Sequence, residues 1–213
     1  MIPGRKLRGD WYPGVIPKNV RIDPTAYIGS TYCFGRFRSE DRVGASIGKA
    51  AMLDASVLDV GPGGKVIIEE YAIVTQAYII CDSEVTIGAY SLIAWNAVLM
   101  DHYRTRADFY HPGTNDAAVA TARCGMGDEP SAAARPIRLG RNAWIGFEAC
   151  VLPGVQIGEG SIVAARSVVV HDVPPFVIVA GNPARIVREL PPEAPMRMNR
   201  ARPDCCRRKP TSA

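Results

Sequence analysis

Three histidines are the side chains of this sequence best suited to accept a proton, and each has its own place in a repeating pattern. His102 stands in VLMDHY, where the pattern stops, His111 follows in FYHPG, and His171 stands in VVHDVP, where the pattern ends. A neutral imidazole can take a proton from a hydroxyl or an amine, so His102 is our candidate for a general base. Asp101 could orient its ring, although adjacent residues of an extended chain normally point to opposite sides. The alternative is that all three are polar surface or coil-end residues.

The pattern is a repeat of six residues, and its clearest run extends from Leu139 to Pro174. An aliphatic residue opens every unit: Leu139, Ile145, Val151, Ile157, Val163 and Val169. A period of six fits neither a helix of 3.6 residues per turn nor a simple alternating strand. We therefore expect each hexad to form one side of a triangular coil in a parallel β-helix. The aliphatic leaders would point inward and stack on those of the next coil.

Shorter runs of the same pattern precede this segment. They begin at Ile22, break at the charged run FRSEDR and resume over 47–57, so whether 22–57 forms complete coils stays open. The later leaders, with a one-residue insertion after the third, are Ile68, Val74, Ile80, Ile87, Ile93 and Leu99. We expect an extended N-terminal segment over 1–21, a β-helix domain over 22–188 and a basic tail over 189–213.

Two segments depart from the hexads. Residues 103–136 carry no leaders, and a loop of that length inside a compact domain is usually functional. Near the C-terminus, a short helix from about Pro183 to Leu190 is expected to end at Pro191, because proline cannot continue a helix.

Composition and charge exclude several classes of function. Of 213 residues 47% are hydrophobic, yet no apolar run approaches the roughly 18–20 residues of a membrane span, and the N-terminus has no apolar signal region. The net charge of +4 is accounted for by six basic and two acidic residues in 191–213 (6 − 2 = +4), so no nucleic-acid partner is expected. The six cysteines show no metal-ligand spacing and are expected to be reduced packing residues of a cytoplasmic protein.

Three turns occur among and after the hexads: AWIG at 143–146, LPGV at 152–155 and GNPAR at 181–185. Together with the hexads they resemble the hexapeptide-repeat acyltransferase family, which includes maltose, galactoside, xenobiotic and nucleotide-sugar acetyltransferases. The resemblance covers about residues 43–188. It implies an all-β fold, a left-handed parallel β-helix of hexapeptide repeats, with the loop at about 103–136 as an excursion and a short C-terminal helix. The handedness is implied by the resemblance alone.

The resemblance also implies an activity. Such relatives transfer an acetyl group from acetyl-CoA to a hydroxyl or an amine of a small acceptor, such as a sugar or a nucleotide-sugar. They need no metal for this reaction, and they assemble as homotrimers with active sites between the subunits. In this chain His102 would be the general base, with Asp101 beside it.

Further residues match the relatives' ligand contacts by position. For acetyl-CoA these positions are Trp144, Ala165, Arg166, His171, Arg185 and Arg188. For the acceptor, Gln76 is the matching position. Asn96 and Tyr103, which are near His102 in sequence, are further candidates, and His111 in the loop is a reserve candidate for the base or an acceptor contact. Guanidinium groups suit the coenzyme phosphates by charge and by their forked geometry. Gln76 stands where sugar O-acetyltransferases have an asparagine, so the identity of the acceptor stays open.

Two other functions are compatible with the same fold. One is a zinc-dependent carbonic anhydrase, in which histidines from regular coils meet at a subunit interface. Two of the three histidines here lie at or within the loop instead, and that spacing does not match. The other is a non-catalytic scaffold, whose loop and basic tail would bind a protein partner while the coenzyme groove stays empty.

Overall fold

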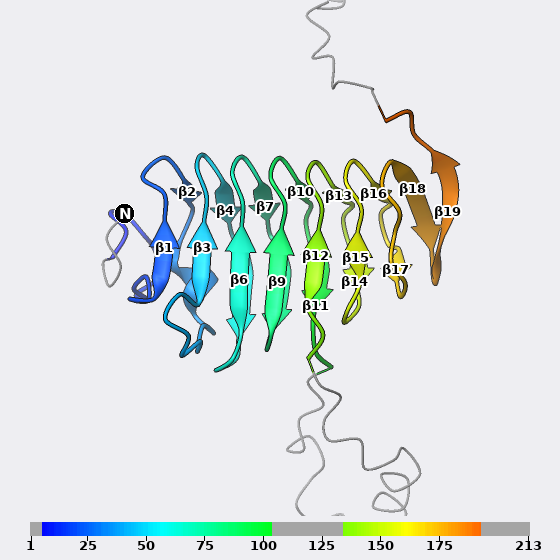
Figure 1. Cartoon of the computed structure of the whole chain (residues 1–213). Helices are drawn as coiled ribbons and strands as arrows, with labels where there is room; N and C mark the ends of the chain where they lie inside the picture. The colour runs from blue at the N-terminus through cyan, green and yellow to red at the C-terminus, as the bar shows by residue number, and fades with distance from the viewer. Residues whose placement is uncertain (1–5, 104–133, 193–213) are drawn as a thin grey trace, which may run out of the picture.

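The computed structural model describes residues 6–103 and 134–192, which form triangular coils stacked into a parallel β-helix (Figure 1). The three sides of the coils form three sheets, named A, B and C in the order in which the chain visits them. In Figure 1 the chain climbs the front sheet, crosses behind it and advances away from the N-terminus, so the helix is left-handed. The predicted all-β, left-handed parallel β-helix is confirmed.

Every strand belongs to one of the three sheets. Sheet A contains β1 (Val20–Ile22), β3 (Ala45–Ile47), β6 (Lys65–Ile68), β9 (Glu84–Ile87), β12 (Ile137–Leu139) and β15 (Gln156–Ile157). Sheet B contains β2 (Tyr27–Ile28), β4 (Met52–Asp54), β7 (Ile73–Thr75), β10 (Leu92–Ile93), β13 (Trp144–Ile145), β16 (Ile162–Val163), β18 (Val177–Gly181) and β19 (Ala184–Glu189). Sheet C contains β5 (Val57–Val60), β8 (Tyr78–Cys81), β11 (Val98–Met100), β14 (Cys150–Val151) and β17 (Val168–Val169).

The hexad leaders form the core, as the sequence predicts. Leaders of one coil pair in register with those of the next coil, as Leu139 does with Ile157 and Ile145 with Val163. All six leaders of the regular run are buried. Full burial of an aliphatic side chain contributes about 1.5–3 kcal/mol, so the stacked column stabilises coils that could not fold singly. One earlier leader was assigned wrongly, because β8 buries Ile79 and turns Ile80 outward.

Left-handed backbone at two corners turns each coil. At the corner between sheets A and B it occurs at Ala50, Tyr71, Tyr90, Asn142 and Phe176. At the corner between sheets B and C it occurs at Ala55, Gln76, Asn96, Glu148 and Arg166. Non-glycine residues adopt positive φ uncommonly, and here each column repeats it coil after coil at the same corner. The coils also approach closely beside the second corner, where a Cβ on Gly146 would lie 2.6 Å from the backbone nitrogen of Ala165.

The predicted C-terminal helix is wrong. The segment from Ala184 to Glu189 is β19, which pairs antiparallel with β18 and ends sheet B. Unpaired backbone groups on the edge of β18 offer hydrogen bonds to any following segment, and β-branched Ile186 and Val187 favour a strand. The prolines that follow indicate where a regular element stops, but they do not indicate its type.

The first coil is irregular on its third side. A 3-10 helix, η1 (Thr31–Phe34), takes the place of a strand, and Phe37 bridges to Val60 of the next coil. The coil that follows contributes β3, β4 and β5, one strand to each sheet. Among the described residues no helix is long and apolar enough to cross a membrane.

Asp10 ties the N-terminal segment to η1. Its carboxylate accepts hydrogen bonds from the Ser30 hydroxyl (2.7 Å), the Thr31 backbone N–H (2.7 Å) and the Tyr12 backbone N–H (3.1 Å). Burial acts to raise the pKa of Asp10, but the hydrogen bonds from Thr31, Ser30 and Tyr12 outweigh it and hold that pKa well below its usual range.

Asp10→Asn is therefore expected to lower the free energy of unfolding by about 1–2 kcal/mol at pH 7, because an amide has only one acceptor oxygen. A depressed carboxyl pKa contributes stability above the unfolded-state pKa, and this contribution is lost as the pH falls through the folded-state value. Urea unfolding at a series of pH values should show the two proteins converging in acid. Asp41→Asn, at an exposed carboxylate, is the control, and a difference that does not change with pH would contradict the assignment.

Candidate functional site

His102 lies just after β11, at the corner where sheet C ends and sheet A begins. Its side chain is mostly buried, with 14% of its surface exposed. The imidazole Nδ1 lies 3.4 Å from Oδ2 of Asp82, whose side chain is 27% exposed. The ring is thus placed with its Nδ1 side toward the carboxylate of the preceding coil.

Asp82 is the site residue that the sequence reasoning missed. Ile80 pairs with Met100, an offset of 20 residues, and the same offset places Asp82 beneath His102 (102 − 20 = 82). The contact therefore joins neighbouring coils and not neighbours in sequence. Counting the coil length back from His102 is the signal that would have found it.

Asp101 points away from the imidazole's side of the chain and into the coil. Its side chain is fully buried, and its two carboxylate oxygens accept the backbone N–H groups of Asp82 (2.8 Å) and Ser83 (2.7 Å). Its carbonyl oxygen accepts the backbone N–H of Arg135 at 2.8 Å. Asp101 thus holds the turn that carries Asp82 and joins the two ends of the excursion, while its predicted part in catalysis stays a prediction.

Cys81 ends β8, just before the same turn, but it is not suited to act as a nucleophile. Burial raises the pKa of its thiol, and the nearby charge of Asp101 raises it further. A thiol must ionise to attack or to bind a metal. No group of three or more histidine, cysteine or acidic side chains in the described part of the chain could hold a metal ion.

Two other predicted residues share this corner. Tyr103 follows His102 and is 45% exposed. Extending the pairing of Val151 with Val169 places His171 on the same corner, two coils further on, with an exposed side chain. His111 lies outside the described residues.

The predicted coenzyme residues other than His171 gather on sheet B and its edges. Trp144 points outward from β13 and is 46% exposed, and Ala165 follows β16 beside the close approach at Gly146. Arg185 and Arg188 are exposed on β19. Arg166 stands at the corner between sheets B and C, where its Nε lies 2.7 Å from Oε2 of Glu148.

Gln76 and Asn96 do not meet His102 within one copy of the chain. They occupy the corner between sheets B and C in neighbouring coils, and the Asn96 backbone N–H donates to the Gln76 carbonyl at 2.8 Å. Sheet C separates that corner from His102. These positions and the predicted base can share a site only if a second copy of the chain brings them together.

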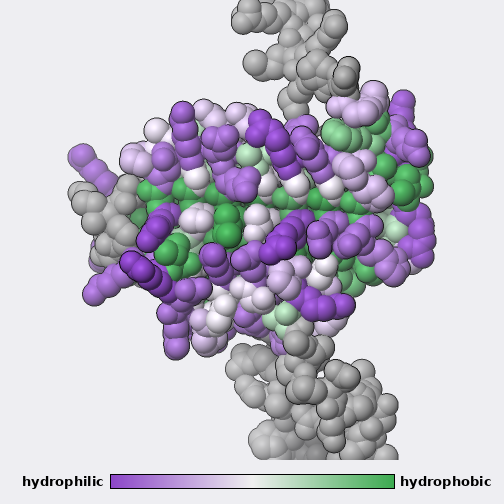
Figure 2. Space-filling view, in the orientation of Figure 1, coloured by the Kyte–Doolittle hydropathy of each residue, from purple (hydrophilic) through white to green (hydrophobic). Residues whose placement is uncertain are grey.

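The outward faces of the three sheets differ in chemistry. On sheet B one in-register row is entirely apolar: Tyr27, Met52, Ile73, Leu92, Trp144, Ile162 and Ile178. On sheet C the row is also apolar: Val57, Tyr78, Val98, Cys150 and Val168. On sheet A the row is mostly polar: Arg21, Ser46, Ile67, Thr86, Arg138 and Gln156. Figure 2 shows the sheet A side, where hydrophilic residues border a narrow hydrophobic line.

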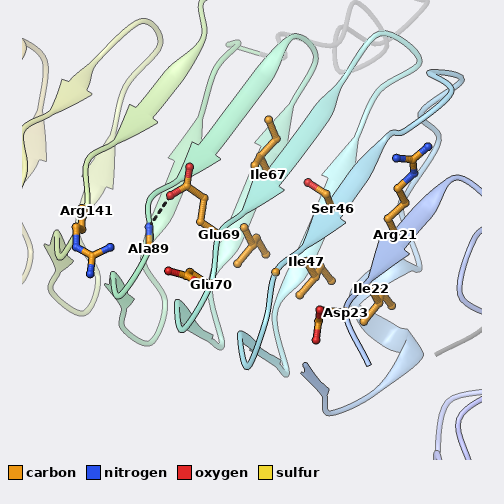
Figure 3. A pocket seen from close by; sticks show the side chains of 12 residues that line it. Arg21, Ile22, Asp23, Ser46, Ile47, Ile67, Glu69, Glu70, Ala89 and Arg141 are labelled. Atoms are coloured by element: carbon orange, nitrogen blue, oxygen red, sulfur yellow. Dashed lines mark hydrogen bonds between the residues drawn. The ribbon is translucent and has the colours of Figure 1, made fainter. Parts of the chain in front are cut away.

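A groove of about 640 Å³ lies on the sheet A side of the corner between sheets A and B (Figure 3). Ile22 and Ile67 contribute apolar surface to it, and Arg141 stands at one end. The Glu69 carboxylate accepts the backbone N–H of Ala89 at 2.9 Å, which fixes that side chain along the groove. The groove is on the opposite side of sheet A from His102, so within one copy it is separate from the predicted base.

Comparison with known proteins links these coils to transferases. Residues 136–171 match the family model described as bacterial transferase hexapeptide (six repeats). Galactoside O-acetyltransferase of Escherichia coli is 47% identical over 55 residues, which cover 26% of this chain and 27% of that enzyme. A Staphylococcus aureus (strain MRSA252) protein named provisionally as an acetyltransferase is 50% identical over 62 residues, 29% of this chain and 31% of that protein. The matches thus span less than a third of the curated relatives' length.

Solved structures extend the likeness to most of the coils. A hexapeptide-repeat acetyltransferase of Vibrio cholerae, complexed with acetyl coenzyme A, aligns with a TM-score of 0.52 and 27% identity over 70% of this chain and 72% of that one. An N-acyltransferase of Bacillus cereus, solved with a dTDP-linked amino-sugar and coenzyme A, aligns at 0.54 with 19% identity over 81% of both chains and supports the fold alone. These findings confirm the resemblance to the hexapeptide-repeat acyltransferases.

Proposed function

We propose that this protein, whose coils carry the bacterial hexapeptide-transferase repeat, transfers an acetyl group from acetyl-CoA to a hydroxyl or an amine of a small acceptor. The observation that carries the proposal is the pairing of His102 with Asp82 at the corner from which the long excursion departs. An imidazole held against a carboxylate is suited to general base catalysis. The coils that follow this corner are those that match the transferase model.

The reaction can be written around this pair. His102 takes the proton of the acceptor hydroxyl or amine as its oxygen or nitrogen attacks the thioester carbonyl carbon. The new C–O or C–N bond forms, the C–S bond breaks, and the proton passes to the leaving sulfur to give CoA–SH. Asp82 stabilises the imidazolium between these steps. With Nδ1 facing Asp82, Nε2 is the nitrogen that exchanges the proton.

Acetyl-CoA is placed by this proposal along sheet B. Trp144 and Ala165 line the face on which the pantetheine would lie. Arg185 and Arg188 are exposed at the end of the same sheet, where guanidinium groups could pair with phosphates. The Vibrio cholerae structure, with acetyl coenzyme A bound to similar coils, supports this assignment.

A homotrimer accounts for the two apolar faces. Large exposed apolar surfaces on a folded protein mark interaction sites. When sheet B of one copy faces sheet C of the next, with the closest contact near the B–C corners, the contact is head-to-tail, and a three-fold rotation closes it into a ring. The polar sheet A then faces solvent. This arrangement places the corner that holds Gln76 and Asn96 at the three-fold axis, on the far side of sheet C from His102.

The decisive experiment is turnover of acetyl-CoA, followed as release of free thiol, with a panel of sugars, amino-sugars and nucleotide-sugars. We expect turnover with one acceptor class and none without an acceptor. Coenzyme A at a hundredfold above its dissociation constant should also raise the free energy of unfolding by about 2.7 kcal/mol. A protein that neither binds the coenzyme nor turns it over would be the non-catalytic scaffold, and the proposal would be abandoned.

Asp82→Asn should impair the action of His102 without affecting the binding of acetyl-CoA. We expect the turnover number to fall about 10- to 100-fold, because the imidazolium loses its carboxylate partner while the general base is retained. The KM for acetyl-CoA should stay unchanged, since Asp82 is not among the residues of sheet B and its edges that are proposed to bind the coenzyme.

The control for Asp82 is Asp59→Asn in the preceding coil. Asp59 pairs with exposed Arg36 and Arg38, at 3.5 and 3.4 Å. This variant should keep wild-type turnover. If turnover falls equally in Asp82→Asn and Asp59→Asn, both carboxylates contribute only to the stability of the folded protein.

A further inference from the structure

Two tyrosines and an arginine form a stacked column at the corner between sheets A and B. The rings of Tyr71 and Tyr90 stack with centroids 4.9 Å apart and planes 20° from parallel. The Arg141 guanidinium lies 4.3 Å from the centroid of the Tyr90 ring. The tyrosines are 37% and 44% exposed, so the column is part of the surface. The roles proposed so far do not use it.

The column ends beside a small residue. The pairing of Met52 with Ile73 places Ala50 at the corner position one coil before Tyr71. A methyl side chain at that position leaves room for a flat ring against Tyr71. Aromatic side chains and guanidinium planes bind nucleobases by stacking, and the guanidinium also suits a phosphate.

The column lies at the same height along the coil axis as the predicted base. Tyr90 and His102 belong to one coil, which runs through β9, β10 and β11. Tyr71 lies one coil earlier and Arg141 one coil later. A three-fold rotation about an axis parallel to the coils leaves the height of every residue unchanged. In the proposed trimer the column of one copy is therefore level with His102 of its neighbour.

The trimer also brings the two corners to one groove. When sheets B and C face each other, the B–C corners point to the axis. The C–A corner of one copy, with His102, then stands beside the A–B corner of the next copy, with the tyrosines. Around a three-fold axis each copy has a sector of 120°, and the corner of a triangular coil is narrower than that sector. Sheet B of one copy and sheet C of the next therefore move apart with distance from the axis. The result is a wedge-shaped groove, with His102 of one copy on one rim and the stacked column of the next copy on the other.

We infer that the acceptor bridges this groove and stacks a planar ring on Tyr71 and Tyr90 of the partner subunit, while its hydroxyl or amine faces His102. This inference rests on the proposed acetyl transfer. The acceptor class that fits is a sugar linked to a nucleotide, because a nucleobase can occupy the space above Ala50 and stack on Tyr71. Neighbouring strands are about 4.8 Å apart, so that space lies about 10 Å below the coil of His102, a distance that the ribose and phosphates can span.

The first test compares a nucleotide-sugar with the same sugar lacking the nucleotide. The double variant Tyr71→Ala/Tyr90→Ala should raise the KM for the nucleotide-sugar about tenfold or more, since each stacked base contributes substantially to affinity. The KM for acetyl-CoA and the mass of the trimer should not change. Phe176→Ala, an aromatic residue further along the same corner, is the control and should keep the wild-type acceptor KM. Equal use of both acceptors, or an unchanged KM in the double variant, would overturn the inference.

The second test asks whether the base and the column come from different copies. His102→Ala and Tyr71→Ala/Tyr90→Ala are mixed in equal amounts and refolded together, and turnover is measured at an acceptor concentration below the KM. Random assembly gives an intact groove at about one interface in four, so the mixture should regain about a quarter of wild-type turnover. If the turnover of the mixture does not exceed half the turnover of the tyrosine double variant alone, His102 and the tyrosines act within one copy, and the inference is rejected. An inactive wild-type protein would instead reject the proposed function.

Discussion

His102→Ala is expected to reduce acetyl transfer by about 10²- to 10⁴-fold, the usual contribution of a positioned general base. The imidazole is mostly buried, so the alanine leaves a small cavity beside the Asp82 carboxylate in place of the proposed base. The dissociation constant for acetyl-CoA should be unchanged, because the proposed coenzyme face is on sheet B. Thiol release and coenzyme binding should be measured on the same preparation.

His171→Ala is the matched control for this variant. It removes the same side chain from the same corner two coils further on, where the histidine is exposed. We expect its turnover number to stay within a fewfold of wild type, with any effect appearing in the KM for acetyl-CoA. If His102→Ala retains full turnover, the reaction has another base, although the assignment of the chain as a transferase would stand.

Val98→Asp is expected to dissociate the trimer and abolish turnover. Val98 points outward from β11 in the apolar row of sheet C, between Tyr78 and Cys150. An unpaired carboxylate buried in an interface costs several kcal/mol per copy, more than a typical assembly tolerates. The mass in solution should fall to that of a single chain of 23.0 kDa.

Thr86→Asp provides the control, because Thr86 points outward from β9 on the polar sheet A of the same coil. It should keep both the trimer mass and the turnover. Circular dichroism should show β structure in both variants, since neither side chain faces the core. A wild-type protein that is already a stable monomer would refute the trimer and the shared groove together.

The sequence predicts the regular coils well because the information is local and periodic. Each leader from Leu139 to Val169 is an aliphatic residue at the first position of a hexad, and its side chain is buried. The orientation found in one hexad therefore predicts the orientation in the next. The prediction fails where pairing decides the outcome. Glu189 ends a strand and not a helix, because the exposed edge of β18 selects the conformation of the segment after it.

The candidate site is less predictable from sequence than the coils are. His102 can be identified from the sequence because it stands where the regular repeat ends. Asp82 can be identified only from the register of adjacent coils. Asp101 is adjacent in sequence, but its carboxylate is occupied by the backbone amides of the preceding turn. The outward rows on sheets B and C are likewise visible only once each strand is aligned with its neighbour.

The hydrogen bond from the Arg135 backbone N–H to the Asp101 carbonyl has a consequence for how such proteins diversify. It joins the points at which the excursion leaves and rejoins the coils, so the rungs on either side stay continuous whatever intervenes. The entropic cost of closing a loop grows only slowly with its length. Insertions, deletions or whole replacements between these two anchor points should therefore cost little folding free energy, so this segment can change in length and sequence over evolution while the coils stay the same.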